Sequence, residues 1–137
     1  MARLLAIDFG TKRSGIAVTD ELQIIASGLT TVFTNELISF LVAYTSKEII
    51  ETIIVGEPKR MDNSSSESEQ AIQKFLKKLS VSIPDIPIKR YDERFTSKLA
   101  FQAMIDGGLK KQQRKNKALV DEISATLILQ GYMDSKR

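Results

Sequence analysis

Three acidic residues stand at places from which they could act together. Asp8 follows the short apolar run LLAI at residues 4–7, Glu93 follows the run at residues 88–91, and Asp121 lies in the first turns of an expected helix. Ligands gather beyond the carboxyl ends of parallel strands, so Asp8 and Glu93 could meet there, and a helix packed across the sheet could add Asp121. Three such carboxylates can hold two divalent ions, one to activate water and one to stabilise a leaving oxygen.

The composition restricts the chemistry to oxygen and nitrogen groups other than imidazole. The 137-residue chain has no cysteine and no histidine. Thiolate and histidine-ligated zinc sites are therefore excluded, as are catalytic triads that depend on histidine. Carboxylates prefer hard cations, so the expected cofactor is Mg²⁺ or Mn²⁺.

Each acid also has a purely structural explanation. An aspartate at a strand end is a common turn former, and Asp121 near a helix start could serve only to favour the helix dipole. Asp92 competes with Glu93, because neighbouring side chains of a strand point to opposite faces and only one of the two should face Asp8. The spacing alone leaves these alternatives open.

The elements expected to position these acids alternate between strands and helices. Strands are expected at 4–7, 14–20, 24–33, 52–55 and 88–91. Helices are expected at about 37–49 with Thr34 or Asn35 as the cap, after a capping box formed by Ser66 and Glu69, at about 96–107, and at about 118–133. This order predicts one α/β domain over residues 1–137. Its five-stranded mixed sheet would have three antiparallel strands followed by parallel strands, with helices on both faces.

Charge is unevenly distributed along the chain. Residues 89–117 hold nine basic and three acidic residues, whereas residues 1–88 hold nine basic and eleven acidic ones. A basic region confined to one part of the chain favours a polyanionic partner, although a solvated loop is the simpler explanation of a charge run alone. The N-terminal MARLLAIDFG does not resemble a signal peptide and no apolar stretch is long enough to span a bilayer, so we expect a cytoplasmic protein without a membrane partner.

Four ordered motifs resemble one known family. They are IDFGTKRSGIAVTD at 7–20, VGEP with the following MD at 55–62, YDERFTS at 91–97, and VDEISATLILQ at 120–130. In order and spacing these resemble the YqgF/RuvX family, the RuvC-like branch of the RNase H-like fold. The resemblance covers nearly the whole chain. The chain departs from the family pattern at Glu57, Arg60 and Asn63, which leaves the contacts of the serine-rich loop that follows, and the role of Glu57, undetermined.

The resemblance implies a nuclease that hydrolyses phosphodiester bonds. Members are described as processing the 5′ end of pre-16S rRNA during ribosome maturation, which would make assembling ribosomal particles a partner; an older description is Holliday junction resolvase. By motif match, Asp8, Glu93 and Asp121 take the metal-binding carboxylate roles. The sequence does not choose between RNA and junction DNA, or between a monomer and a homodimer.

Basic residues beside these motifs are candidates for binding nucleic-acid phosphates. They are Lys12, Arg13 and Arg94, together with Lys110, Lys111, Arg114, Lys115 and Lys117 of a linker before the last helix. Arg94 could instead pair with Asp92. Two other functions remain open: an actin-like phosphotransferase, suggested by the DFGT motif at 8–11, and a binding module without catalysis.

Overall fold

The computed structural model describes residues 2–58, 69–92 and 117–136. Its elements are β1 (Arg3–Asp8), β2 (Arg13–Thr19), β3 (Ala26–Phe33), the 3₁₀ helix η1 (Thr34–Glu36), α1 (Leu37–Lys47), β4 (Ile50–Glu57), α2 (Glu69–Ser82), β5 (Ile88–Asp92) and α5 (Lys117–Ser135). The helix expected at 96–107 lies outside the described residues.

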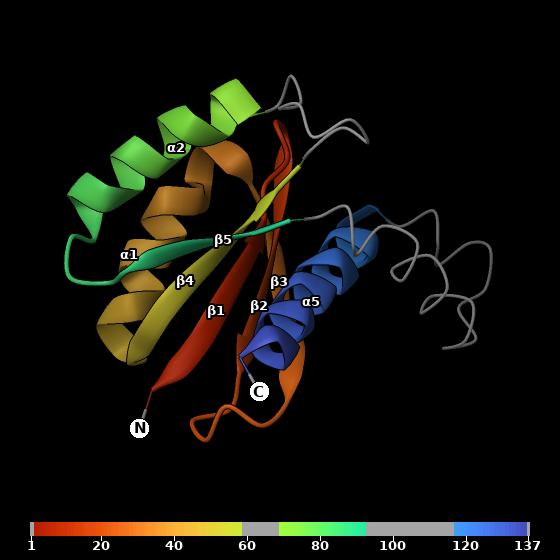
Figure 1. Ribbon diagram of the computed structural model, residues 1–137. Coiled ribbons are helices and arrows are strands. Elements are labelled where there is room, and N and C mark those ends of the chain that lie inside the picture. The colour runs from red at the N-terminus through yellow and green to blue at the C-terminus, as the bar shows by residue number, and fades with distance from the viewer. Residues whose placement is uncertain (1, 59–68, 93–116, 137) are drawn as a thin grey trace.

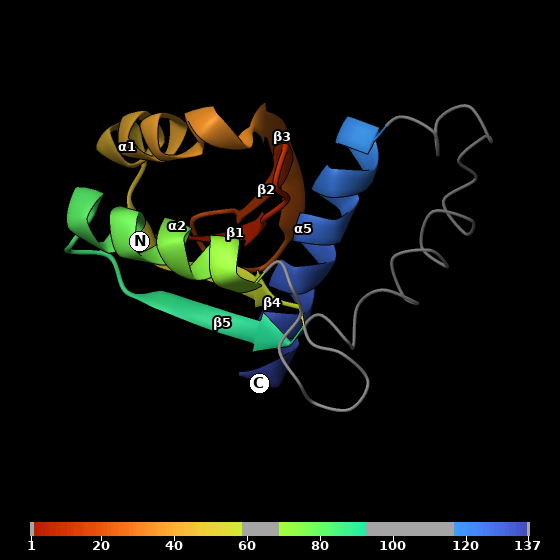
Figure 2. The ribbon, with the colours of Figure 1, turned by 90° about the horizontal axis from the view of Figure 1, so that it is seen from above.

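The five strands form one mixed sheet in the order β3-β2-β1-β4-β5. β1 pairs antiparallel with β2, and β2 pairs antiparallel with β3, whereas β4 is parallel to both β1 and β5. Helices α1 and α2 cover one face and α5 covers the other, as Figures 1 and 2 show. The α/β architecture predicted from the sequence is confirmed.

Strand alternation divides the core into two parts. On β1, Leu5 and Ile7 are fully buried in a cluster with α1 and α2, whereas Leu4 and Ala6 are buried in a second cluster under α5. β1 is central and covered on both sides, which explains why its sequence is a continuous apolar run rather than an alternating one. In the described part of the chain, no helix is both long and apolar enough to cross a bilayer.

Three local expectations were wrong. Neither Thr34 nor Asn35 caps α1: Glu36 stands at the cap position without a side-chain hydrogen bond, and the Thr34 hydroxyl is shared between the Gly10 carbonyl and the Ser14 hydroxyl. β3 begins at Ala26, not at residue 24, and α1 ends at Lys47, so that Ile49 is exposed.

The displaced start of β3 has its cause in Asp20. Its carboxylate accepts hydrogen bonds from the backbone N–H groups of Leu22, Ile24 and Ile25, at 3.2, 2.8 and 2.8 Å. These bonds satisfy donors that a longer strand would have offered to the sheet. Ile24 and Ile25 therefore lie in an exposed loop despite their β-branched side chains.

The Asp20 loop should loosen in acid. The N–H groups of Ile25, Ile24 and Leu22 lower the pKa of Asp20 below its ordinary value. The loop is therefore stabilised above the pKa that Asp20 has in the unfolded chain, and this stabilisation is lost as the pH falls through the lower pKa of the folded state. Amide NMR of Ile25 should show a transition below the titration range of an exposed aspartate. The same transition in Asp20→Ala would contradict this assignment.

Candidate active site

Asp8 ends β1 on the face of the sheet that α5 covers. Leu4 and Ala6 of the same strand pack in the α5 cluster, and alternation places Asp8 on their side. Its side chain is half-buried. The first of the predicted acids therefore lies at the carboxyl end of the central strand, beside α5.

Asp121 lies next to this position because α5 packs directly on Gly15. Gly15 is the residue of β2 opposite Asp8 in the sheet. A Cβ atom at Gly15 would lie 2.1 Å from the backbone oxygen of Asp121 and 3.0 Å from its Cβ atom, so only glycine permits this approach. Two of the three predicted acids are thus brought together by one glycine.

Arg13 belongs to the same group of charges. Its Nε atom lies 3.3 Å from Oδ2 of Asp121, and the two side chains are 28% and 24% exposed. The guanidinium holds the Asp121 carboxylate at the start of β2. Lys12, which the sequence analysis also predicted as a phosphate-binding residue, is exposed in the turn between β1 and β2.

Asp92 and Glu57 lie on the other face of the sheet. They are register partners at the ends of β5 and β4. Arg90, two residues before Asp92, contacts α2, and Val55, two residues before Glu57, packs in the α1–α2 cluster. Alternation therefore places both carboxylates on the face away from Asp8.

The remaining predicted site residues lie wholly or partly outside the described part of the chain. Those outside the described residues are Glu93, Arg94, Lys110, Lys111, Arg114 and Lys115. Lys117 begins α5, but its side chain is also outside the description.

A partly buried ion pair supports this end of the sheet. The Arg90 guanidinium donates to both carboxylate oxygens of Glu69 at 2.9 Å, and also to the backbone oxygens of Val55 and Gly56 at 3.1 and 2.9 Å. It joins the start of α2 to the ends of β4 and β5. Sequence reasoning marked Glu69 only as part of a helix start, because no local spacing links it to Arg90.

Comparison with known proteins identifies the family. A family model described as "RuvX: Holliday junction resolvase" matches residues 2–135. The chain belongs to the RuvX family. A relative from Christiangramia forsetii, named "Putative pre-16S rRNA nuclease", is 63% identical over 133 residues, covering 97% of this chain and 98% of the relative. A relative of the same name from Phocaeicola vulgatus is 61% identical, covering 100% of this chain and 99% of its own.

Solved structures confirm the RNase H-like fold of this RuvX-family protein. A Thermus thermophilus RuvC chain, solved in complex with a Holliday junction substrate, matches with a TM-score of 0.60 at 16% identity, over 97% of this chain and 96% of that one. A second T. thermophilus RuvC structure matches with a TM-score of 0.52 at the same identity. At this identity the likeness establishes the fold alone.

The two described carboxylates of this RuvX-family protein are of the ligand type that hard divalent cations prefer. Asp8 and Asp121 offer oxygen ligands, as Mg²⁺ and Mn²⁺ prefer. Within residues 2–58, 69–92 and 117–136, no group of three or more acids is arranged to hold a metal. These described residues include Asp8 and Asp121 of the three predicted metal-binding acids, whereas Glu93 lies outside them.

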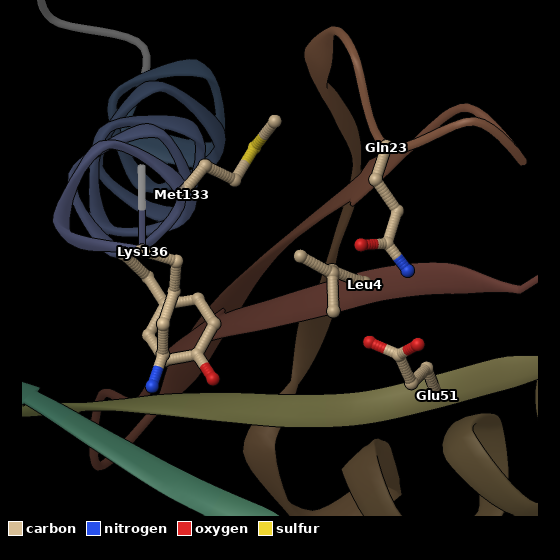
Figure 3. Close-up of a pocket in the computed structure, with 6 residues that line it drawn as sticks. Leu4, Gln23, Glu51, Met133 and Lys136 are labelled. Atoms are coloured by element: carbon tan, nitrogen blue, oxygen red, sulfur yellow. The ribbon is translucent and has the colours of Figure 1, made fainter.

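A pocket of about 360 Å³ lies at the opposite end of the sheet. It is formed by the starts of β1 and β4, the β2–β3 loop and the end of α5, and Figure 3 shows Gln23 and Glu51 on one side of it with Met133 and Lys136 on the other. Because Asp8 stands at the other end of β1, this pocket is separate from the RuvX-family acids.

Proposed function

We propose that this RuvX-family protein is a divalent-metal-dependent endonuclease that processes the 5′ end of pre-16S rRNA. Asp8, Asp121 and Glu93 would be its metal-binding carboxylates. The observation that carries the proposal is the meeting of Asp8 and Asp121 across Gly15, from the first strand and the last helix. Family membership over residues 2–135 supports nuclease activity.

The chain supplies a rigid frame for such a site. Asp8 is fixed by the central strand, and Asp121 is fixed by the packing of α5 and by Arg13. Bound Mg²⁺ or Mn²⁺ would supply an activated water and charge stabilisation at the leaving oxygen. Arg13 and Lys12 would attract phosphates on either side of the reacting bond, and the basic residues of 94–117 would extend that attraction.

The face of Asp92 supports Glu93 as the third carboxylate. Asp92 lies on the α1–α2 side of the sheet, whereas Asp8 and Asp121 lie on the α5 side. A ligand set must converge on one face, so Asp92 is the poorer candidate of the two neighbours.

A pair of conservative substitutions tests this choice. Glu93→Gln should lower the cleavage rate at least about 100-fold, since even the partners of metal ligands typically account for about 10–100-fold. Asp92→Asn should retain most of the activity. Single-turnover rates at saturating Mg²⁺ provide the comparison, and a more damaging Asp92→Asn would reverse the assignment.

The choice of rRNA as substrate rests on the close relatives. Two relatives named as pre-16S rRNA nucleases share 63% and 61% identity over nearly full length, whereas T. thermophilus RuvC shares 16%. The description of the family as a Holliday junction resolvase makes four-way DNA the second candidate.

The purified protein should therefore be incubated with a pre-16S rRNA fragment and, in parallel, with a four-way DNA junction, in Mg²⁺ and in Mn²⁺. We expect cleavage of the rRNA near the mature 5′ end. Preferential cutting of the junction would establish the second candidate. Tight binding of either substrate without cleavage would identify a binding module instead.

A further inference from the structure

A second pocket lies on the α1–α2 side of the sheet, immediately behind Asp8. Its volume is about 400 Å³, within the range of small-molecule sites, and it lies between the β1–β2 turn, η1 and the facing sides of α1 and α2. Phe9 and Phe75 line it, with ring centroids 5.2 Å apart and planes tilted by 36°, and Ile38 adds a third apolar side chain. The pocket therefore has an aromatic and aliphatic wall.

Its polar rim is positively charged. Lys74 and Lys78 are one helical turn apart on α2, and both line the opening. Two like charges at this spacing destabilise a helix slightly unless an anion lies between them. Within the described part of the chain, neither ammonium makes an ion pair, and no acidic residue lines the pocket. This charge favours an anionic occupant.

The pocket also lies one residue from the proposed active site. Phe9 follows Asp8 directly, and successive side chains at a strand end point to opposite faces. Thr11, in the turn that joins β1 to β2, lines the same opening. A nucleic-acid strand bound at Asp8 on the α5 side would therefore reach the pocket by crossing only the β1–β2 turn.

We propose that this pocket binds one unpaired nucleotide of the substrate strand beside the cleavage site. The proposal rests on the proposed nuclease function, because it requires a strand that passes Asp8. The base would lie against the wall formed by Phe9, Phe75 and Ile38, and the neighbouring phosphates would lie between Lys74 and Lys78. Apolar and aromatic contact with bases beside cationic groups is the usual basis of single-strand binding. A base held in a duplex could not enter.

The double variant Lys74→Gln/Lys78→Gln tests the rim. Lys47→Gln/Lys77→Gln is the matched control. Both of these lysines are exposed and lie outside the pocket lining, and replacing them removes the same amount of positive charge. Binding of a fluorescent single-stranded RNA, without divalent ions, should be measured over a range of salt concentrations. The slope of log affinity against log salt should fall by about 1.4 for the pocket variant, which corresponds to two phosphate contacts on a single strand. The control should keep the wild-type slope.

Two further probes isolate the base. A fully paired duplex of the same sequence should bind the pocket variant and the control equally. A series of single-stranded RNAs, each with one abasic position, should reveal one position at which the loss of the base lowers wild-type affinity. Equal single-strand slopes for the pocket variant and the control, or the absence of a sensitive position, would overturn the proposal.

Cleavage is measured separately, so that the two proposals can fail independently. If wild type cuts RNA while pocket variant and control bind alike, the nucleotide pocket is wrong and the nuclease assignment stands. The salt slope of RNA binding could instead fall for the pocket variant alone, while wild type with Mg²⁺ cuts neither substrate. In that case the pocket is a binding site and the nuclease assignment is wrong.

Discussion

Replacing Asp8 by asparagine should lower the cleavage rate at least about 100-fold without unfolding the protein. Losing a residue that only hydrogen-bonds to a metal ligand typically costs about 10–100-fold, and losing a ligand itself should cost more. The amide has nearly the same shape but lacks the negative charge that a hard cation requires. Asp8 lies close to Asp121, so removing one negative charge relieves repulsion, and the melting temperature should be unchanged or higher. Asp121→Asn should behave similarly in cleavage, but it also loses the Arg13 ion pair, which at this exposure contributes about 0–1 kcal/mol.

The matched control for Asp8→Asn is Asp85→Asn. Asp85 is exposed between α2 and β5, at the other end of the sheet from Asp8. Its variant should cut at the wild-type rate. Single-turnover kinetics and thermal melting measure both effects. Near-normal cleavage by Asp8→Asn would remove this residue from the mechanism.

Gly15→Ala should destabilise the protein and lower its cleavage rate together. The new Cβ atom would lie 2.1 Å from the backbone oxygen of Asp121. Neither β2, which is an interior strand, nor the long helix α5 can shift easily to relieve this clash. Overpacking of this kind typically costs about 1–3 kcal/mol. The helix must also move away from β2, which displaces Asp121 from Asp8, so cleavage should fall as well.

Gly28→Ala provides the comparison on the neighbouring strand. There the nearest atom to an added Cβ is the Cβ of Glu122 at 3.3 Å, a side-chain atom rather than backbone. Its stability loss, measured by urea unfolding, should be clearly smaller than that of Gly15→Ala. Equal losses for the two variants would show that contact with α5 at Gly15 is not what positions Asp121.

The sheet was predictable because its pattern is local. The run at residues 4–7 is apolar on both sides, which predicts a buried central strand, and the later β-α-β order predicts parallel neighbours. Asp8 and Asp121 were identified by motif and by expected strand and helix ends. Their actual proximity depends on Gly15, whose crowding by α5 no sequence pattern records.

What the sequence missed depends on contacts between distant residues. The Thr34 hydroxyl serves Gly10 and Ser14 rather than its own helix, and the Arg90–Glu69 pair joins two elements that no periodicity connects. The Asp20 loop overrides the β propensity of Ile24 and Ile25 by offering their N–H groups a nearer acceptor. The face of Asp92 became clear only from the register of β4 and β5.

The central claim is that acids at the end of β1 and on α5 support metal-dependent hydrolysis of a nucleic-acid backbone. The most direct measurement follows cleavage of an end-labelled pre-16S rRNA fragment by the wild-type protein in Mg²⁺, and again after addition of excess EDTA. We expect cleavage in Mg²⁺, none in EDTA, and recovery when Mg²⁺ or Mn²⁺ is restored. Cleavage at an undiminished rate in excess EDTA would contradict the account.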